Sequence, residues 1–291
     1  MSPQTSQGAA EALLSQFEEH LILTQLSPST VVNYLADLRA VVRWGMDYVG
    51  PQFSLATLSP DLIRRYRSHL LKEKQCAAAT INRRLQALRK FGAFAVRAGL
   101  IHSNPAQGIQ LVQDEGRVRT APLSGKQVEV LLQVSGSEQP SLARRATAIL
   151  MLLLHTGIRV NELVELRLDD VRFDHPGTHL LIKDGRNGVT REIPLKGEVR
   201  HVLYEYLAVR PNVEGESHLF LSREGRSLSA RSVQRIVSSR ARAAGLEGVS
   251  PQALRRTYAN RLLARTGDLA LVSERLGHQN LATTTRYISE L

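Results

Sequence analysis

Apolar residues recur every three or four positions along the first hundred residues, a spacing that predicts amphipathic helices. Ser-Pro pairs at 27–28 and 59–60 precede two of these runs, and a serine in that position caps a helix. A third run begins at Thr80. The Asn-Pro pair at 104–105 ends the helical block, because the residue before a proline disfavours helix. We therefore predict a helical N-terminal domain over residues 8–106.

A polar stretch separates this block from the rest of the chain. Residues 107–122 are polar and irregular, which is typical of a linker between domains. Beyond it, Ser124 begins another helix, and residues 143–154 are apolar nearly all round, as in a buried helix. The Thr-Gly pair at 156–157 ends that helix, and a short amphipathic helix follows. A second domain is expected over residues 123–291.

A β-hairpin is predicted in the middle of the second domain. Residues 178–182 and 189–194 have strand-like sequences, and the KDGRNG stretch between them contains two strong turn-forming pairs. Helices are expected again over 197–209, 230–244 and 253–265, and through the last residues. The expected fold class is therefore mainly α, with one small hairpin or sheet in the second domain.

The composition is that of a globular protein, with 43% apolar and 22% charged residues. Cys76 is the only cysteine, which excludes an intramolecular disulfide and a metal site built on paired cysteines. The N-terminus lacks the basic start and apolar core of a secretory signal. The longest apolar run, 146–154, is far shorter than the ~20 residues that span a bilayer. We expect a soluble cytoplasmic protein that does not associate with membranes.

The charge points to a class of partner. With 38 Lys and Arg against 27 Asp and Glu, the net charge is +11 and the pI is about 10.3, which favours nucleic acid as partner. Residues 58–100 hold ten basic residues and only two acidic ones. A solvated helix face usually mixes the two signs, so this excess favours contact with DNA phosphates. The candidates are Arg64, Arg65, Arg83, Arg84, Lys90 and Arg97, of which Arg83, Lys90 and Arg97 recur every seven residues along one helix face.

Four places in the second domain set polar or cationic groups beside breaks in apolar helices. Arg159 follows the Thr-Gly break, and Lys183 stands where the first strand meets the turn. Gln252 and Arg255 are three residues apart, so they share one face of a helix's first turn. The last place is a Leu-Gly-His sequence near the C-terminus, with a tyrosine nine residues after its histidine. Spacing alone does not distinguish a structural role from a reactive one.

Taken together, these motifs resemble those of the tyrosine recombinase (phage integrase) family. The stretches that carry the resemblance are TGIRVNELVEL, the KDGRNG hairpin, PQALRRT, and LGH followed by Tyr287. Four such elements in this order are specific, and the resemblance covers both domains. The small Xer-type bacterial recombinases are most similar in layout. The resemblance implies a helical, SAM-like core-binding domain followed by a mixed, mostly helical catalytic domain.

The resemblance also implies a role for each candidate residue. Tyr287 would attack a DNA phosphate, and its phenol, with an ordinary pKa of about 10, requires activation. Arg159 and Arg255 would bind the non-bridging oxygens of the transition state. His278 would hydrogen-bond a phosphate oxygen or assist proton transfer. Lys183 would protonate the leaving 5′ oxygen. No metal ion, ATP or other cofactor is implied.

Several assignments stay open on the sequence alone. Arg159 would also form a salt bridge with Glu162, one helical turn along. Arg186 lies in the same turn as the hairpin lysine, which we favour because an arginine is a poor proton donor. Arg255 and Arg256 are adjacent and face in different directions, so only one is expected to line the site. The histidine and the tyrosine would, on a structural interpretation, merely pack within their helices.

The function expected is site-specific recombination of double-stranded DNA. Four protomers would bind two sites, each protomer holding the duplex between its two domains. Strands would exchange through a 3′-phosphotyrosyl intermediate and a Holliday junction, at the bacterial nucleoid, with a partner recombinase or accessory factor if needed. One alternative is a type IB topoisomerase-like enzyme, which reseals the same strand. The other is a DNA-binding protein of the same fold with weak or silenced strand transfer.

Two features depart from the family pattern. Gln252 occupies the position of a family histidine, and a glutamine cannot exchange protons near neutral pH. Only residues 288–291 follow Tyr287, whereas Xer-type relatives carry a further helical tail that docks on a neighbouring protomer. We therefore expect that contact to be absent in its usual form, and Tyr287 to be poorly ordered until DNA binds.

Gln252→His tests the first departure. If the residue mainly positions the phosphate or the tyrosine, the rate of covalent protein–DNA adduct formation will change modestly, in either direction. If the family histidine is mainly a base for the tyrosine, a glutamine at this position lowers that rate by about 10²–10⁴-fold, and Gln252→His would raise it by the same factor. We expect the modest change, and a gain of several orders of magnitude would contradict it.

Overall fold

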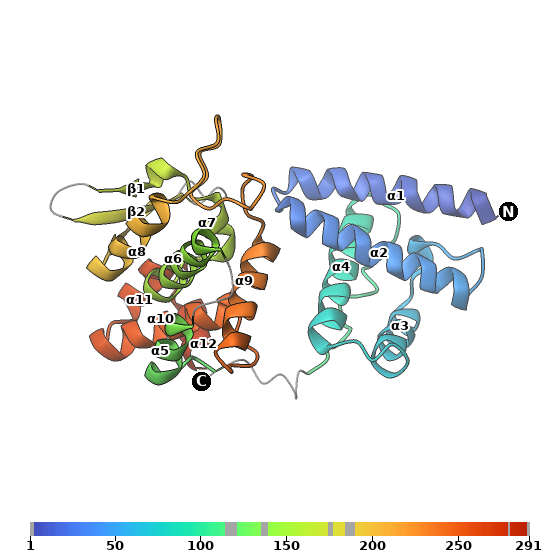
Figure 1. Cartoon of the computed structure of the whole chain (residues 1–291). Coiled ribbons are helices and arrows are strands. Elements are labelled where there is room, and N and C mark those ends of the chain that lie inside the picture. The colour runs from blue at the N-terminus through green and yellow to red at the C-terminus, as the bar shows by residue number, and fades with distance from the viewer. Residues whose placement is uncertain are drawn as a thin grey trace. The chain divides into compact units, whose positions relative to one another are not determined.

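The computed structural model describes residues 3–113, 121–134, 139–173, 177–183, 190–278 and 280–289. The chain divides into two units, Met1–Arg117 and Val118–Leu291, which Figure 1 draws from blue to teal and from green to red. The predicted linker, 107–122, falls partly outside the described residues.

Helices make up most of the described part of the first unit. Ser27 accepts a hydrogen bond from the backbone N–H of Thr30 (3.2 Å), and Ser59 accepts one from that of Leu62 (3.2 Å). Both predicted helix starts at Ser-Pro pairs are thus confirmed. The third predicted helix begins two residues earlier than expected. The elements are α1 (Pro3–Leu23), α2 (Pro28–Tyr48), the 3-10 turn η1 (Leu55–Thr57), α3 (Pro60–Lys72) and α4 (Ala78–Arg97).

The apolar faces of these helices form the core of the first unit. Phe17 of α1 packs against Phe91 and Phe94 of α4, with ring centroids 5.5 and 5.4 Å apart. Tyr66 of α3 is also buried. Val96, in the last turn of α4, is 37% exposed.

Helices make up most of the second unit, and a small sheet lies at one edge of it (Figure 1). Figure 1 shows α6 among the other helices of this unit, and it packs against α5, α8, α9 and α10. The predicted burial of α6 is confirmed, because its apolar residues from Ala148 to Leu154 are all buried. The helices are α5 (Gly125–Gln133), α6 (Pro140–Thr156), α7 (Val160–Glu165), η2 (Leu168–Asp170), α8 (Gly197–Leu207), α9 (Ala230–Ala243), α10 (Pro251–Thr266), α11 (Leu269–Leu276) and α12 (Leu281–Ser289).

The sheet has three antiparallel strands in the order β1-β2-β3. β2 (Thr178–Lys183) and β3 (Thr190–Leu195) form the predicted hairpin, and residues 184–189 between them lie outside the described residues. β1 (Val171–Arg172) was not predicted, since two residues show no recognisable alternation of apolar and polar positions.

The turn after α6 places a backbone carbonyl where the predicted site forms. Gly157 ends α6 in the left-handed region, at φ 62°, and a Cβ there would lie 2.3 Å from Cδ1 of Tyr258. Only glycine fits both constraints. The Gly157 carbonyl accepts a hydrogen bond from Arg255 of α10 at 2.5 Å.

Gly157→Ala is expected to lower the free energy of unfolding of the second unit by about 2–5 kcal/mol. The left-handed backbone contributes roughly 1–2 kcal/mol of this cost, and the clash with Tyr258 contributes about 1–3 kcal/mol. Gly245→Ala is the control, because Gly245 has φ 68° but open space around its Cβ position. Urea denaturation measures both variants, and equal losses would contradict the close approach of Tyr258.

Candidate active site

Arg255 is the most buried cation of the candidate site. Ser250 caps α10 by accepting from the backbone N–H of Ala253 (3.3 Å), which sets Arg255 in the first turns of that helix. The side chain is 3% exposed and donates to the carbonyls of Gly157 (2.5 Å) and Leu276 (2.7 Å). Among the described residues, no carboxylate lies within salt-bridge distance of it.

Burial lowers the pKa of Arg255 to about 10, and the charge of Arg159 acts in the same direction. The guanidinium is nevertheless cationic at neutral pH. A buried positive charge without a carboxylate partner attracts an anion strongly.

Arg159, the second arginine of the site, has a carboxylate partner, unlike Arg255. It is the N-cap residue of α7, and its Nη1 donates to Glu162 at 3.0 Å. Its Nη2 donates to the carbonyl of Gly277 at 2.8 Å. The predicted salt bridge between Arg159 and Glu162 is therefore present, yet the arginine side chain is still 41% exposed.

Glu162 has a second partner that the motif did not indicate. Arg191 of β3 binds both of its carboxylate oxygens, at 3.0 and 2.9 Å. Burial acts to raise the pKa of Glu162, but the hydrogen bonds and charge of Arg191, with those of Arg159, outweigh it and lower that pKa. Glu162 is therefore an anion shared by two arginines.

His278 follows Gly277 at the end of α11 and reaches the same cluster. Its Nε2 lies 3.2 Å from Nη2 of Arg255, and its Nδ1 lies 2.8 Å from the hydroxyl of Thr284. A guanidinium only donates, so Nε2 accepts and Nδ1–H donates to Thr284. Burial, followed by the charges of Arg255 and Arg159, lowers the pKa of His278 to about 4. The imidazole is thus neutral at physiological pH.

Tyr287 completes the cluster from α12. Its ring meets that of His278 edge to face at 5.7 Å between centroids, and its hydroxyl donates to the carbonyl of Gln252 at 3.5 Å. Burial raises its pKa, although Arg255 and Arg256 act to lower it. Tyr287 is therefore a neutral phenol in the free protein.

Two expectations about this region differ from the structure. Tyr287 was expected to be poorly ordered, but it is half-buried in a helix and packs on a small apolar cluster around Leu262 and Leu276. Arg256 was expected to face away if Arg255 lined the site. Instead its guanidinium carbon lies 5.6 Å from the centroid of the Tyr287 ring. The ring stands over two adjacent positions of α10, so both arginines reach it.

Lys183 lies apart from this cluster in the free protein. Its Nζ pairs with Asp170 Oδ1 at 2.6 Å, and Lys183 does not line the cavity that Arg159, Gln252 and Arg255 share. Asp170 precedes β1, so a short strand that the sequence did not predict brings this carboxylate beside the hairpin. Arg186, the alternative, lies outside the described residues.

A cavity of about 520 Å³ gathers three of the predicted residues, Arg159, Gln252 and Arg255, between α7, α9 and α10. Its walls add polar groups from α9, Gln234 and Ser238. In the described parts of the chain, no group of three His, Cys, Asp or Glu side chains is suited to hold a metal ion. Two guanidiniums, a neutral imidazole and a phenol are together suited to bind a phosphodiester and attack its phosphorus.

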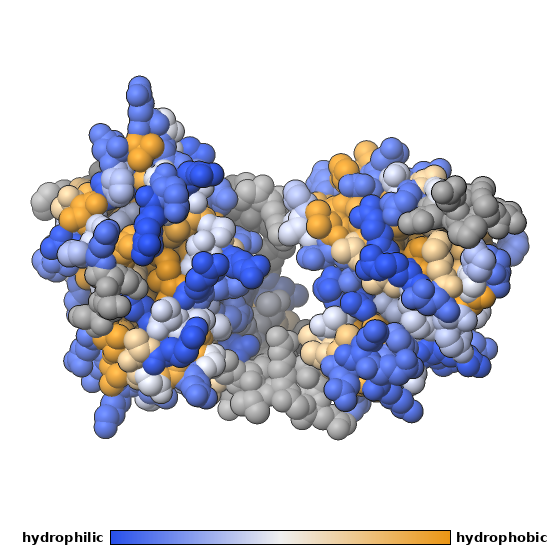
Figure 2. Space-filling view, turned by 45° about the vertical axis from the view of Figure 1, so that its right-hand side comes forward, coloured by the Kyte–Doolittle hydropathy of each residue, from blue (hydrophilic) through white to orange (hydrophobic). Residues whose placement is uncertain are grey.

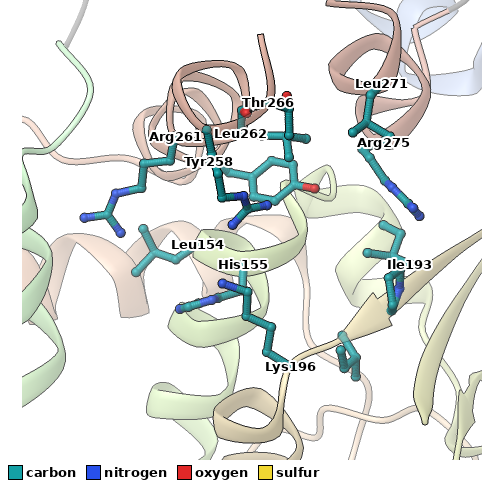
Figure 3. A pocket seen from close by; sticks show the side chains of 13 residues that line it. Leu154, His155, Ile193, Lys196, Tyr258, Arg261, Leu262, Thr266, Leu271 and Arg275 are labelled. Carbon is teal, nitrogen blue, oxygen red and sulfur yellow. Dashed lines mark hydrogen bonds between the residues drawn. The ribbon is translucent and has the colours of Figure 1, made fainter. Parts of the chain in front are cut away.

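A second cavity, of about 330 Å³, contains none of the predicted residues. Figure 3 shows it between the end of α6, β3, α10 and α11, with His155, Lys196, Arg261 and Arg275 around it and Leu154 and Ile193 among its apolar residues. Burial, then the charge of Lys196, lowers the pKa of His155.

The basic residues of the first unit fall into two groups. Arg83 pairs with Asp37 of α2 at 2.5 Å, and Arg84 lies 3.6 Å from the same carboxylate and donates to Tyr66 (3.2 Å). Burial raises the pKa of Asp37, and the two arginines only partly offset this. Acidic partners missing from the local sequence are thus supplied by another helix, and Arg84 is 23% exposed.

The other four candidates are exposed, as Arg83 is, but they form no described ion pair with another helix. Arg64 pairs with Asp61 at 2.6 Å and Arg65 donates to Tyr48 at 2.9 Å, whereas Lys90 and Arg97 extend from α4. Figure 2 shows mostly hydrophilic residues, with scattered apolar ones, over the visible face of each unit. The structure contains, among its described helices, none with the length and apolar character needed to cross a bilayer.

The fold and the cluster together define the class of protein. A helical domain precedes a mostly helical domain that carries a cluster of two arginines, a histidine and a tyrosine. Residues 122–291 match the model of the phage integrase family, and residues 14–99 match that of the phage integrase N-terminal SAM-like domain. Tyrosine recombinase XerC of Alcanivorax borkumensis is 35% identical over 90% of this chain and 84% of its own length. Tyrosine recombinase XerD of Lacticaseibacillus casei is 30% identical over 94% of this chain and 92% of its own length. The chain belongs to the phage integrase family.

Solved structures share the fold at lower identity. A lambda integrase dimer bound to a COC′ core site aligns with a TM-score of 0.73 at 20% identity, over 94% of this chain and 96% of that one. The Tn1549 transposon integrase in complex with transposon right end DNA aligns with a TM-score of 0.75 at 18% identity, over 94% of each chain. The predicted fold class, mainly α with a small sheet in the second unit, is confirmed.

His278 offers a direct test of the electrostatics of the cluster. With its pKa near 4, its imidazole is expected to stay neutral from pH 8 down to about pH 5, and its NMR signals to stay constant over that range. Arg159→Gln removes one of the charges that depress this pKa, so the titration is expected to move to higher pH. Titration of His278 near its ordinary pKa of about 6.5 in the unmodified protein would contradict the arrangement.

Proposed function

We propose that this chain is a site-specific DNA recombinase that uses Tyr287 as its nucleophile. The observation that carries the proposal is the buried, uncompensated cation Arg255 beside Arg159 and Tyr287. Two guanidiniums fit the two non-bridging oxygens of a phosphodiester, and they become more strongly bound as charge gathers on those oxygens. Such contacts accelerate the reaction because they bind the transition state more tightly than the ground state.

Each cleavage exchanges one ester bond for another. The phenolic oxygen of Tyr287 attacks phosphorus and its proton passes to solvent, while the bond from phosphorus to the 5′ oxygen breaks and that oxygen takes up a proton. The strand then carries a 3′-phosphotyrosyl link and a free 5′ hydroxyl. A 5′ hydroxyl of the partner duplex attacks the same phosphorus in the reverse sense, releasing Tyr287 as a phenol. The bond energy is conserved, so no ATP is consumed, and two rounds form and resolve a Holliday junction.

The remaining candidates support these steps. His278 is a neutral imidazole, and it donates to a phosphate oxygen from Nε2 once its proton moves from Nδ1 to that nitrogen. Gln252 contributes hydrogen bonds without exchanging protons. Lys183 protonates the leaving 5′ oxygen, which requires it to leave Asp170 when DNA enters.

The first unit binds the duplex by its phosphates. Lys90 and Arg97, with Arg64 and Arg65, are exposed cations suited to this contact, and Arg83 contributes to a lesser degree because of Asp37. The domains proposed are 8–106 for DNA binding and 123–291 for catalysis, with 107–122 as the linker. Four protomers assemble on two sites, as in a solved lambda integrase tetramer bound to a Holliday junction. The enzyme works in the bacterial cytoplasm, at the nucleoid.

A DNA-binding protein with silenced strand transfer is the second candidate. The pairing of Lys183 with Asp170 at 2.6 Å and the neutral phenol of Tyr287 favour it. A type IB topoisomerase-like enzyme would share the chemistry but act as a monomer. These candidates differ in what they leave on DNA, so one series of experiments separates all three.

Tyr287→Phe is expected to abolish covalent protein–DNA adducts. Sheared DNA of the source organism is incubated with the protein, adducts are trapped in detergent, and the recovered sequence defines a duplex that is then nicked next to the cleavage site. Phenylalanine lacks the attacking oxygen, so adduct formation on this duplex is expected to fall below detection. Tyr258→Phe is the matched control, since Tyr258 belongs to the same unit but lines the other cavity.

The products identify the function. Adducts that depend on Tyr287, followed by recombinant products from two sites, establish the recombinase. Relaxation of a supercoiled plasmid without recombinants favours the topoisomerase-like enzyme. Specific DNA binding without any adduct favours the silenced protein, and adducts that persist in Tyr287→Phe contradict the assignment of the nucleophile.

A further inference from the structure

Arg191 of β3 is a buried arginine that touches neither the cavity nor the tyrosine. Its side chain is 11% exposed, and its main partner is Glu162, 9% exposed. Its Nε donates to the carbonyl of Arg275 at 3.1 Å. One guanidinium therefore links β3, the start of α7 and the end of α11, three elements that are far apart in the sequence.

Glu162 stands between two arginines that share its oxygens. Oε1 lies 3.0 Å from a guanidinium nitrogen of Arg159 and 3.0 Å from one of Arg191. Oε2 accepts from the backbone N–H of Arg159 at 2.6 Å and from Arg191 at 2.9 Å. The side chain of Arg159 thus holds Glu162 by one nitrogen, whereas that of Arg191 holds it by two.

This division of contacts decides how much of the charge of Arg159 is available to a phosphate. A carboxylate with a single arginine partner binds that arginine through both oxygens and neutralises its charge. Because Arg191 takes that place, Arg159 keeps its Nη2 for the carbonyl of Gly277 and remains 41% exposed.

Arg191 also supports the turn that carries His278. A Cβ on Gly277 would lie 2.7 Å from Nη1 of Arg191, so the guanidinium packs directly on this turn. The Gly277 carbonyl in turn accepts from Arg159. The position of Arg159 therefore depends on Arg191 twice, through Glu162 and through Gly277.

We propose that Arg191 is a positioning residue for catalysis, which binds Glu162 and so keeps Arg159 free for the scissile phosphate. The inference rests on the proposed function, since it concerns the same phosphate. Without Arg191, the Glu162 carboxylate turns to Arg159 and withdraws it. The loss then appears in the rate of cleavage more than in DNA affinity, because Arg159 makes only one of many phosphate contacts.

A purely structural role makes a different prediction, and Arg275 provides the control for it. Arg275 donates to the carbonyl of Glu192 at 2.8 Å, so its side chain also fastens α11 to β3. It has no contact with Glu162 among the described hydrogen bonds and ion pairs. If Arg191 only fastens these elements, Arg191→Gln and Arg275→Gln will have similar effects.

The experiment measures adduct formation on the nicked duplex defined by covalent capture, together with DNA affinity and thermal unfolding, for the full chain. Four variants are compared: Arg191→Gln, Arg191→Lys, Arg275→Gln, and Arg191→Gln combined with Glu162→Gln. Arg191→Gln is expected to slow adduct formation by about 10–100-fold, as for a small displacement of a reacting group. Its DNA affinity is expected to change by less than about threefold.

The other variants separate electrostatic from structural effects. Arg275→Gln is expected to stay within about twofold of the unmodified rate. Arg191→Lys keeps the charge and is expected to lie between Arg191→Gln and the unmodified protein. Adding Glu162→Gln to Arg191→Gln removes the competing carboxylate. The double variant is expected to form adducts at least about fivefold faster than Arg191→Gln alone, a non-additive result that shows coupling of the two residues.

Three results would overturn the proposal. They are a folded Arg191→Gln variant that cleaves within threefold of the unmodified protein, an equal loss in Arg275→Gln, and no recovery in the double variant. If Arg191→Gln does not fold, the double variant tests the proposal instead, because it leaves no buried charge unpaired. A rate of adduct formation within about tenfold of the unmodified protein supports the proposal, and a lower rate contradicts it. Absence of adducts in the unmodified protein would instead overturn the proposed function.

Discussion

A buried guanidinium without a carboxylate partner is the constraint on which the site depends. Arg255 is 3% exposed, and the carbonyls of Gly157 and Leu276 and Nε2 of His278 accept hydrogen bonds from its guanidinium. Each of these contacts requires a particular turn, and both turns have glycine in the left-handed region. The ends of α6 and α11 therefore serve one purpose, which is to hold a cation ready for an anion.

Local patterns were sufficient to predict most of the fold. Serine caps, apolar periodicity and a turn-rich hairpin are properties of neighbouring residues, so α2, α3, α8, α9 and the hairpin β2–β3 were predicted with boundaries close to those of the structure, whereas no bounds were predicted for α1 or α11. The order of the four motifs likewise indicated Arg159, Arg255, His278 and Tyr287, and the structure brings these side chains together. Which roles they have remains a proposal.

The contacts that sequence reasoning missed join residues far apart in the chain. Arg191 reaches Glu162 across 29 positions, and Arg83 reaches Asp37 across 46. Lys183 pairs with Asp170 because a two-residue strand, too short to be recognised, brings them together. Counting charges in a window of sequence gave an excess of cations in the first unit, but a carboxylate on another helix occupies two of them. Pairing between elements is set by packing, which a local pattern does not contain.

The point of attachment to DNA tests the central claim most directly. The adduct trapped on DNA is digested with trypsin and nuclease, and the peptide that retains a nucleotide is sequenced by mass spectrometry. The account predicts that the nucleotide lies on the tryptic peptide that begins at Tyr287, linked through a 3′ phosphate. A nucleotide on another peptide, such as the one that contains Tyr258, or a link through a 5′ phosphate, would contradict it.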